Sequence, residues 1–219
     1  MRTFSKLLLL VAALAVIATA VSCGKKKEAV KPPETTAPQP GFGDKRVLVV
    51  YSSHSGETYT PDGIVMQQEG NTELMARKIV SHLGKGDLFR IETVKPYPTN
   101  YQECCDVAKA ELESKAMPEL QSVVERIDDY DVIFIGYPIW CGTYPRAVAS
   151  FIDKMSQGLN GRIIIPFSTN EGSDWGESLG DLKAALPGSL FYPGLALRGS
   201  KVGESEKQIN EWLDQLDKR

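Results

Sequence analysis

Hydrophobic and polar positions follow two alternating patterns between residues 45 and 216. Short apolar runs rich in β-branched residues predict buried strands, because a strand covered on both faces shows no polar alternation. Segments with apolar residues three or four positions apart predict amphipathic helices. The predicted strands are residues 45–51, 87–94, 131–136, 162–167 and 189–197, the last broken by Pro193-Gly194.

Predicted helices separate these strands. They cover residues 71–83, 101–127 with a break at Pro118, about 147–155, 180–186 and about 204–216. Strands separated by helices indicate right-handed βαβ units and a parallel sheet with helices on both faces. The pattern therefore predicts a doubly wound α/β domain.

The first 22 residues have a different character. Arg2 and Lys6 precede an apolar stretch over residues 7–21, which is short for a membrane span, and small residues precede Cys23. This end resembles a bacterial lipobox. The resemblance implies that residues 1–22 are a lipoprotein signal peptide and that Cys23 carries the lipid, which would hold the mature protein on a bacterial membrane outside the cytoplasm. A simple membrane anchor is the alternative interpretation.

Residues 23–43 predict a flexible tether. Three consecutive lysines at 25–27 are followed by four prolines among Thr, Ala and Gln residues. Such a segment cannot bury enough apolar surface to fold, so it is expected to act as an extended linker. The folded domain is then expected over residues 44–219.

Charge and cysteine content narrow the possible partners and sites. The chain has 25 basic and 28 acidic residues, and loss of Arg2 and Lys6 leaves 23 against 28, so the net charge goes from −3 to −5. An acidic domain argues against nucleic-acid binding, which needs a basic face. Once Cys23 is acylated, three cysteines remain, at 104, 105 and 141, and they specify no disulfide framework. No His, Cys or Asp cluster has metal-ligand spacing.

The turn after the first predicted strand is a candidate anion site. Residues 52–56 read Ser-Ser-His-Ser-Gly, and the next predicted helix begins at Asn71-Thr72. Unpaired backbone N–H groups and the helix dipole converge at such a helix start. The turn has no Lys or Arg and lacks the G-x-x-x-x-G-K-[ST] signature of nucleotide hydrolysis. We therefore expect it to hold a static cofactor phosphate.

Two further loops follow the strands predicted at 131–136 and 162–167. The parallel sheet should bring their ends beside the first turn. Residues 136–145 carry large aromatic side chains that follow no helical or strand pattern of buried positions. Residues 168–176 are rich in glycine and small polar residues. A phosphate cradle beside such loops predicts a pocket for a flat, phosphorylated ring.

These three loops, in this order, resemble the flavodoxin-like family over about residues 45–216. The most specific segment is Gly-Tyr-Pro-Ile-Trp at 136–140 with Gly-Thr-Tyr-Pro at 142–145, supported by Ile-Pro-Phe at 165–167 and Pro-Tyr-Pro at 96–98. The resemblance implies a five-stranded parallel sheet in the order 2-1-3-4-5. It also implies non-covalent binding of FMN. The implied phosphate residues are Ser53, His54, Ser55, Asn71 and Thr72; those beside the ring are Pro138, Trp140, Gly142, Thr169, Asn170, Gly172 and Ser173.

Two features depart from the family pattern. Residues 57–70 separate Gly56 from Asn71, as in a subset of the family that carries an insert here. Glu57 is expected to turn away with this insert, because a carboxylate beside the phosphate would repel it. Cys141 stands where many relatives have a second aromatic residue.

The resemblance implies an electron-transfer protein whose partner is a redox protein or a quinone. No acid–base catalyst stands out in the sequence, which favours a carrier over a substrate-specific enzyme. Two alternatives remain open. One is an NAD(P)H-dependent flavin quinone reductase, and the other is a binding module that keeps the fold without the flavin.

Overall fold

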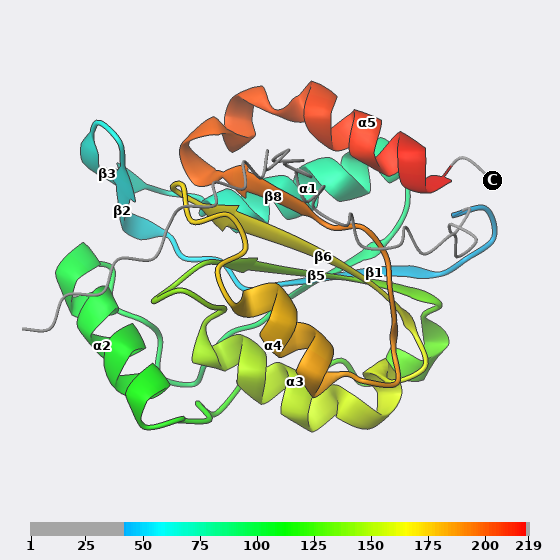
Figure 1. The fold of residues 1–219 in the computed structure, drawn as a ribbon, viewed down its shortest axis with the longest axis horizontal. Helices are drawn as coiled ribbons and strands as arrows, with labels where there is room; N and C mark the ends of the chain where they lie inside the picture. Colours follow the sequence, from blue (N-terminus) through cyan, green and yellow to red (C-terminus); the bar gives the residue numbers. More distant parts are fainter. Residues whose placement is uncertain (1–41, 218–219) are drawn as a thin grey trace, which may run out of the picture. The chain divides into compact units, whose positions relative to one another are not determined.

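The computed structural model describes residues 42–217 (Figure 1). The predicted signal peptide, Cys23 and the tether up to residue 41 lie outside these residues. Among residues 42–217, no helix is long and apolar enough to cross a membrane.

A parallel sheet forms the centre of the domain. Its strand order is β4-β1-β5-β6-β7, and β8 also pairs with β6. Every strand pair in this sheet is parallel, which confirms the predicted doubly wound α/β class. The strands are β1 (Val47–Tyr51), β4 (Asp87–Arg90), β5 (Val132–Pro138), β6 (Ile163–Asn170), β7 (Leu190–Phe191) and β8 (Leu195–Arg198).

The strand order differs from the prediction at one edge. The strand predicted at 189–197 is two short strands, so the sheet has six strands rather than five. β7 pairs with Ile163 and Ile164, and β8 pairs with residues from Phe167 onward. Pro166 and Pro193 lie at the gap between them, and proline has no N–H to donate to a ladder. The two prolines therefore explain the interruption.

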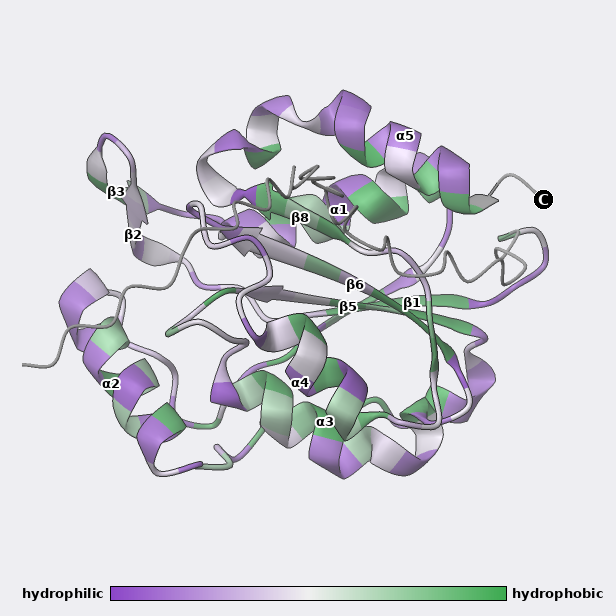
Figure 2. Ribbon diagram, in the orientation of Figure 1, coloured by the Kyte–Doolittle hydropathy of each residue, from purple (hydrophilic) through white to green (hydrophobic). Residues whose placement is uncertain are grey.

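Helices cover both faces of the sheet. In Figure 1, α1 (Asn71–Leu83) and α5 (Glu206–Asp217) lie on one face, and α3 (Arg146–Leu159) and α4 (Ser178–Ala185) on the other. All five residues of β1 are buried, and alternate side chains enter the two core layers. Figure 2 shows hydrophobic residues along the central strands, which lie between helices that carry many hydrophilic residues. Each fully buried large apolar side chain contributes about 1.5–3 kcal/mol.

The predicted helix at 101–127 is shorter than expected. α2 (Tyr101–Glu113) ends where Lys115 adopts a positive φ of 52°, before Pro118 is reached. The chain then returns to the core through Leu120, which forms a β-bridge with Thr93, and enters the 3-10 helix η1 (Ile127–Asp129). Burial of Leu120 and Val124 outweighs continuation of the helix, because the helix would carry both residues away from the core.

The insert at 57–70 forms a β-hairpin that the sequence analysis did not predict. β2 (Gly56–Thr60) and β3 (Gly63–Gln67) pair antiparallel and form their own two-stranded sheet. Pro61-Asp62 makes the turn, and the Thr60 hydroxyl donates to the Gly63 carbonyl at 2.8 Å. In Figure 1 the hairpin projects beyond the ends of β5 and β6.

The end of the predicted tether belongs to the domain. Phe42 is only 2% exposed, and its ring centroid lies 5.9 Å from that of Phe134. Lys85 donates to the Gly43 carbonyl. The packed domain therefore extends at least to Phe42, two residues before the predicted boundary at 44. The 3-10 helix η2 (Gly199–Glu204) similarly replaces the predicted start of the last helix.

Candidate functional site

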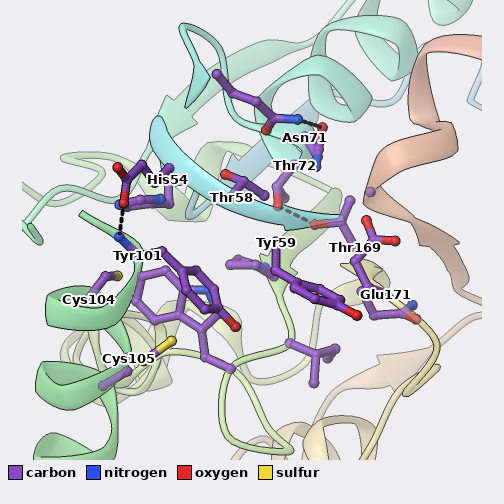
Figure 3. A pocket seen from close by; sticks show the side chains of 18 of the residues that line it. His54, Thr58, Tyr59, Asn71, Thr72, Tyr101, Cys104, Cys105, Thr169 and Glu171 are labelled. Carbon is purple, nitrogen blue, oxygen red and sulfur yellow. Dashed lines mark hydrogen bonds between the residues drawn. The ribbon is translucent and has the colours of Figure 1, made fainter. Parts of the chain in front are cut away.

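A pocket of about 230 Å³ lies at the carboxyl ends of β1, β5 and β6 (Figure 3). Its walls come from the loops after these three strands, the start of α1, the β2–β3 hairpin and one side of α2. Ligands of doubly wound sheets bind at this edge, where the strand order reverses direction. The three loops singled out in the sequence therefore meet at one site.

The N-terminus of α1 opens on this pocket. Leu74 N–H donates to the Gly70 carbonyl at 3.1 Å, and Glu73 N–H donates to Ser53 Oγ at 3.0 Å. The N–H groups of Asn71 and Thr72 have no acceptor within the described chain. Two free amides at the start of a 13-residue helix are suited to an anion.

Gly70 permits this arrangement because of its size. A Cβ atom at this position would lie 2.2 Å from Ser53 Oγ and 2.3 Å from the His54 carbonyl oxygen. No side chain fits there without displacing the loop. Glycine therefore allows the turn after β1 to lie directly against the start of α1.

An ion-pair network centred on the buried carboxylate of Glu73 lies behind the same helix start. The Glu73 carboxylate accepts from Arg77 at 2.8 Å and from Arg90 at 2.7 Å. Arg90 also donates to the Ser53 carbonyl at 3.3 Å. The turn itself has no cation, but β4 supplies one from behind. The two guanidinium groups offset the carboxylate, so the helix start stays favourable for an anion.

Trp140 forms the aromatic wall contributed by the loop after β5. Its ring meets Tyr97 at a centroid distance of 5.0 Å and an angle of 89°, and His54 at 5.8 Å and 73°. The His54 ring itself donates from Nε2 to the Pro98 carbonyl at 2.8 Å. These T-shaped contacts fix the indole in place.

A tight turn follows Trp140. Trp140 and Thr143 exchange two backbone hydrogen bonds, at 2.8 and 3.1 Å. The two residues between them, Cys141 and Gly142, have φ values of 49° and 86°. Two central residues with positive φ are typical of a type I′ turn. The turn leaves Cys141 exposed at the rim of the pocket.

The loop after β6 joins the start of α1 through a buried contact. The Thr169 and Thr72 hydroxyls lie 2.7 Å apart and share a hydrogen bond. Asn170 Oδ1 accepts from Gly172 N–H at 2.7 Å and from Asp174 N–H at 3.1 Å. The Asn170 oxygen therefore organises its own loop.

Seven of the twelve predicted cofactor residues line the pocket: His54, Asn71, Thr72, Pro138, Trp140, Thr169 and Asn170. The other five do not line it. Ser53 holds the start of α1, and the Gly142 carbonyl accepts from Glu177 N–H at 2.7 Å, which links the second and third loops. Ser55, Gly172 and Ser173 lie in the predicted loops but outside the pocket wall.

Further lining residues were not predicted. They come mainly from the hairpin and from α2: Thr58, Tyr59, Gln67, Tyr101, Cys104, Cys105 and Ala108. Glu57 was expected to turn away from the phosphate with the insert. The residue does line the pocket, but its carboxylate is directed to the start of α2, where it accepts from Tyr101 N–H at 2.9 Å and from Asn100 Nδ2 at 2.7 Å. The negative charge is tolerated because it lies at the N-terminus of α2.

The pocket thiols are not arranged for metal binding. Burial raises the pKa of the Cys104 thiol to about 12 and also raises the pKa of Cys141. Within residues 42–217, no group of three or more His, Cys, Asp or Glu side chains could hold a metal ion.

Comparison with known proteins identifies relatives of the whole domain. The model of the Flavodoxin family matches residues 64–216. A crystal structure of a protein assigned as a flavoprotein from Bacteroides eggerthii DSM 20697 is 32% identical, with a TM-score of 0.63, and the match covers 79% of this chain and 98% of that one. No curated protein matches the chain.

A second solved structure shows the same fold at lower identity. It is a flavoprotein from Lactobacillus acidophilus NCFM in complex with FMN, and it is 21% identical with a TM-score of 0.56. The match covers 73% of this chain and 97% of that one.

Proposed function

The chain belongs to the flavodoxin family, and we propose that it binds FMN without a covalent bond in the pocket at the ends of β1, β5 and β6. The observation that carries the proposal is that one pocket joins the free amides of Asn71 and Thr72 to the fixed indole of Trp140. The first suits a phosphate, and the second suits a flat ring.

The residues present fit the phosphate end of FMN. The N–H groups of Asn71 and Thr72 can donate to phosphate oxygens, and the α1 dipole favours the negative charge there. Gly70 keeps the backbone close enough for this contact. Thr72 contributes less through its hydroxyl, because that group already bonds to Thr169.

The residues also fit the ring end. Trp140 is held by Tyr97 and His54, so little side-chain freedom remains to be lost when a ring packs against it. A ring contact of this kind contributes about 1 kcal/mol beyond the burial of apolar area. Pro138 and Ile139 extend the apolar wall toward the strand end.

We propose electron transfer as the activity. When bound, FMN would supply one- and two-electron chemistry, and the chain would bind, orient and shield it. The imidazole and the two carboxylates that line the pocket are engaged in structural bonds: His54 with Pro98, Glu57 with Tyr101, and Glu171 with Ser200 N–H at 2.6 Å. This favours a carrier that serves a redox protein or a quinone over a reductase with its own acid–base catalyst.

The proposed place of action rests on the sequence. Residues 1–22 would direct export, Cys23 would carry the lipid, and residues 24–41 would link the domain to an extracytoplasmic membrane surface. At up to about 3.3–3.6 Å for each extended residue, such a linker would let the domain reach partners well away from its anchor.

The proposed function is tested with the mature chain carrying Cys23→Ser, which has no lipid. Addition of FMN to the flavin-free protein should shift the visible flavin bands and change flavin fluorescence in a saturable way. Steady-state turnover with NADPH and a quinone would instead support the reductase. A protein that leaves the FMN spectrum unchanged would have the fold without the cofactor, and the proposal would fail.

A further inference from the structure

The β2–β3 hairpin is fixed at its base to two helix N-termini. At one end, Glu57 N–H donates to the Thr99 carbonyl at 2.7 Å, and the Glu57 carboxylate accepts from Tyr101 N–H. At the other end, Gln67 Nε2 donates to Asn71 Oδ1 at 3.3 Å. The hairpin therefore spans from the start of α2 to the start of α1, which is the proposed phosphate site.

Gly56 fixes the angle at which the hairpin leaves the turn after β1. Its φ is 130°, and a Cβ there would lie 2.6 Å from the Thr99 carbonyl oxygen. The base of the hairpin therefore packs against the loop that precedes α2. This places β2 along the mouth of the pocket, where Glu57, Thr58 and Tyr59 all line it.

Tyr59 brings a second aromatic surface to the pocket. Its ring centroid lies 6.3 Å from that of Tyr101, with 31° between the ring planes. Figure 3 shows both side chains entering the pocket, Tyr59 from β2 and Tyr101 from α2. Tyr59 is 47% exposed, so a large part of this residue still faces solvent beside the cavity. A flat ligand that packed against it would remove that surface from water.

We propose that the β2–β3 hairpin is a second wall of the cofactor site and that Tyr59 packs against the flavin ring. The inference rests on the proposed binding of FMN and extends it to a residue outside the three loops. Trp140 is fixed by Tyr97 and His54, whereas Tyr59 lies beside Tyr101 and is still 47% exposed, so the flavin ring would add to its contacts. Cys141 stands in the exposed turn after Trp140 and offers no aromatic cover, so the hairpin supplies it.

The test compares the affinity of hairpin variants for FMN and riboflavin, measured by titration of flavin fluorescence. Tyr59→Ala should weaken the binding of both ligands by the same factor, at least about fivefold, because both carry the ring. Tyr59→Phe, which keeps the ring, should bind both as the wild type does. Tyr59→Leu keeps an apolar side chain without an aromatic face, so it should keep part of the affinity and bind both ligands more weakly than Tyr59→Phe does.

Met66→Ala is the matched control. Met66 is 62% exposed on the same hairpin and does not line the pocket, so its removal should leave both affinities unchanged. Thermal unfolding of each variant without flavin checks that the fold is kept. Equal losses in Met66→Ala and Tyr59→Ala would overturn the inference, since the effect would then belong to hairpin stability. If Tyr59→Ala binds both ligands as tightly as the wild type, the inference about Tyr59 is wrong but the proposed binding of FMN stands. If the wild type binds neither ligand, the proposed function is wrong as well.

Discussion

The hydroxyl oxygens of Thr72 and Thr169 lie 2.7 Å apart, although the two residues are separated by 97 positions in the chain. Both side chains are buried. Their hydrogen bond ties the start of α1 to the end of β6, across the part of the sheet where the pocket opens. The start of α1 and the end of β6 are therefore held in a fixed relative position without a ligand.

This bond predicts a specific pattern of stabilities. Thr72→Val or Thr169→Val alone should lower the free energy of unfolding by about 1–3 kcal/mol, because the remaining hydroxyl is buried without a partner. The double Val variant should recover part of this loss, since the two residues would then pack as apolar groups of the same shape. Urea unfolding of the four proteins forms the double-mutant cycle. Additive losses would mean that the hydroxyls do not depend on each other.

The first part of the site could be read from the sequence because strand, turn and helix follow one another there. The apolar run before residue 52 predicted β1, and α1 starts at Asn71 as predicted. What the pattern could not show is how each polar group is used. Ser53 was expected to hold phosphate, and the pattern gave no sign that its hydroxyl also accepts from Glu73 N–H. Such a contact spans 20 residues and leaves no local periodic signal.

The hairpin and α2 were missed as pocket walls for a different reason. Ile64, Val65 and Met66 form an apolar run but stay exposed, so burial does not explain their pattern. The turn Pro61-Asp62-Gly63 was the available signal, because Pro-Asp-Gly favours a chain reversal. For α2, helical periodicity identifies a helix face but not what the face contacts. The pattern therefore does not show that Cys104 and Cys105 both line the pocket.

Close packing at Gly70 predicts that this position does not tolerate a side chain. Gly70→Ala would place a Cβ 2.2 Å from Ser53 Oγ, so the turn must shift. We expect a loss of about 1–3 kcal/mol in the free energy of unfolding, as for other overpacked sites, and weaker binding of FMN.

Gly180→Ala is the control for that substitution. Gly180 lies inside α4 with nothing within 4 Å of its Cβ position, so alanine there should stabilise the protein by up to about 1 kcal/mol. Thermal or urea unfolding separates the two cases. If Gly70→Ala is as stable as the wild type, the prediction is wrong, because the turn after β1 can then shift without lowering the free energy of unfolding.

The cysteines of the pocket should differ in reactivity toward iodoacetamide. At pH 8, Cys141 should be alkylated much faster than Cys104, because Cys141 is exposed and burial raises the pKa of Cys104 to about 12. Raising the pH to 9 should increase the Cys141 rate, since more thiolate forms, and leave Cys104 unmodified. Mass spectrometry of digested protein measures each site. Bound FMN should slow the reaction of Cys141, and rapid labelling of Cys104 in the folded protein would contradict its burial.

Trp140 should contribute to binding of the ring and not of the phosphate. Trp140→Ala is expected to lower the affinities for FMN and for riboflavin by the same factor, about fivefold or more. Trp140→Phe should retain part of both affinities. The reduction potential of bound FMN should also shift, because the surroundings of the ring change. Titration of flavin fluorescence and redox titration measure the two effects. A change in the affinity for FMN alone would place Trp140 at the phosphate end instead.

Arg90, the counter-ion of Glu73 behind the start of α1, should affect the binding of the phosphate group and not that of the ring. Arg90 pairs with the buried Glu73 carboxylate and contacts the Ser53 carbonyl, so Arg90→Ala leaves more uncompensated negative charge beside the amides of Asn71 and Thr72. FMN affinity should then fall by about fivefold relative to riboflavin, which has no phosphate, corresponding to about 1 kcal/mol. Arg126→Ala removes the same charge from an exposed ion pair with Asp129 and should change neither affinity. Both ligands bind the same folded protein, so damage to the fold would weaken the binding of both. An equal loss of affinity for FMN and riboflavin would therefore mean that Arg90 supports the fold and does not act on the anion site.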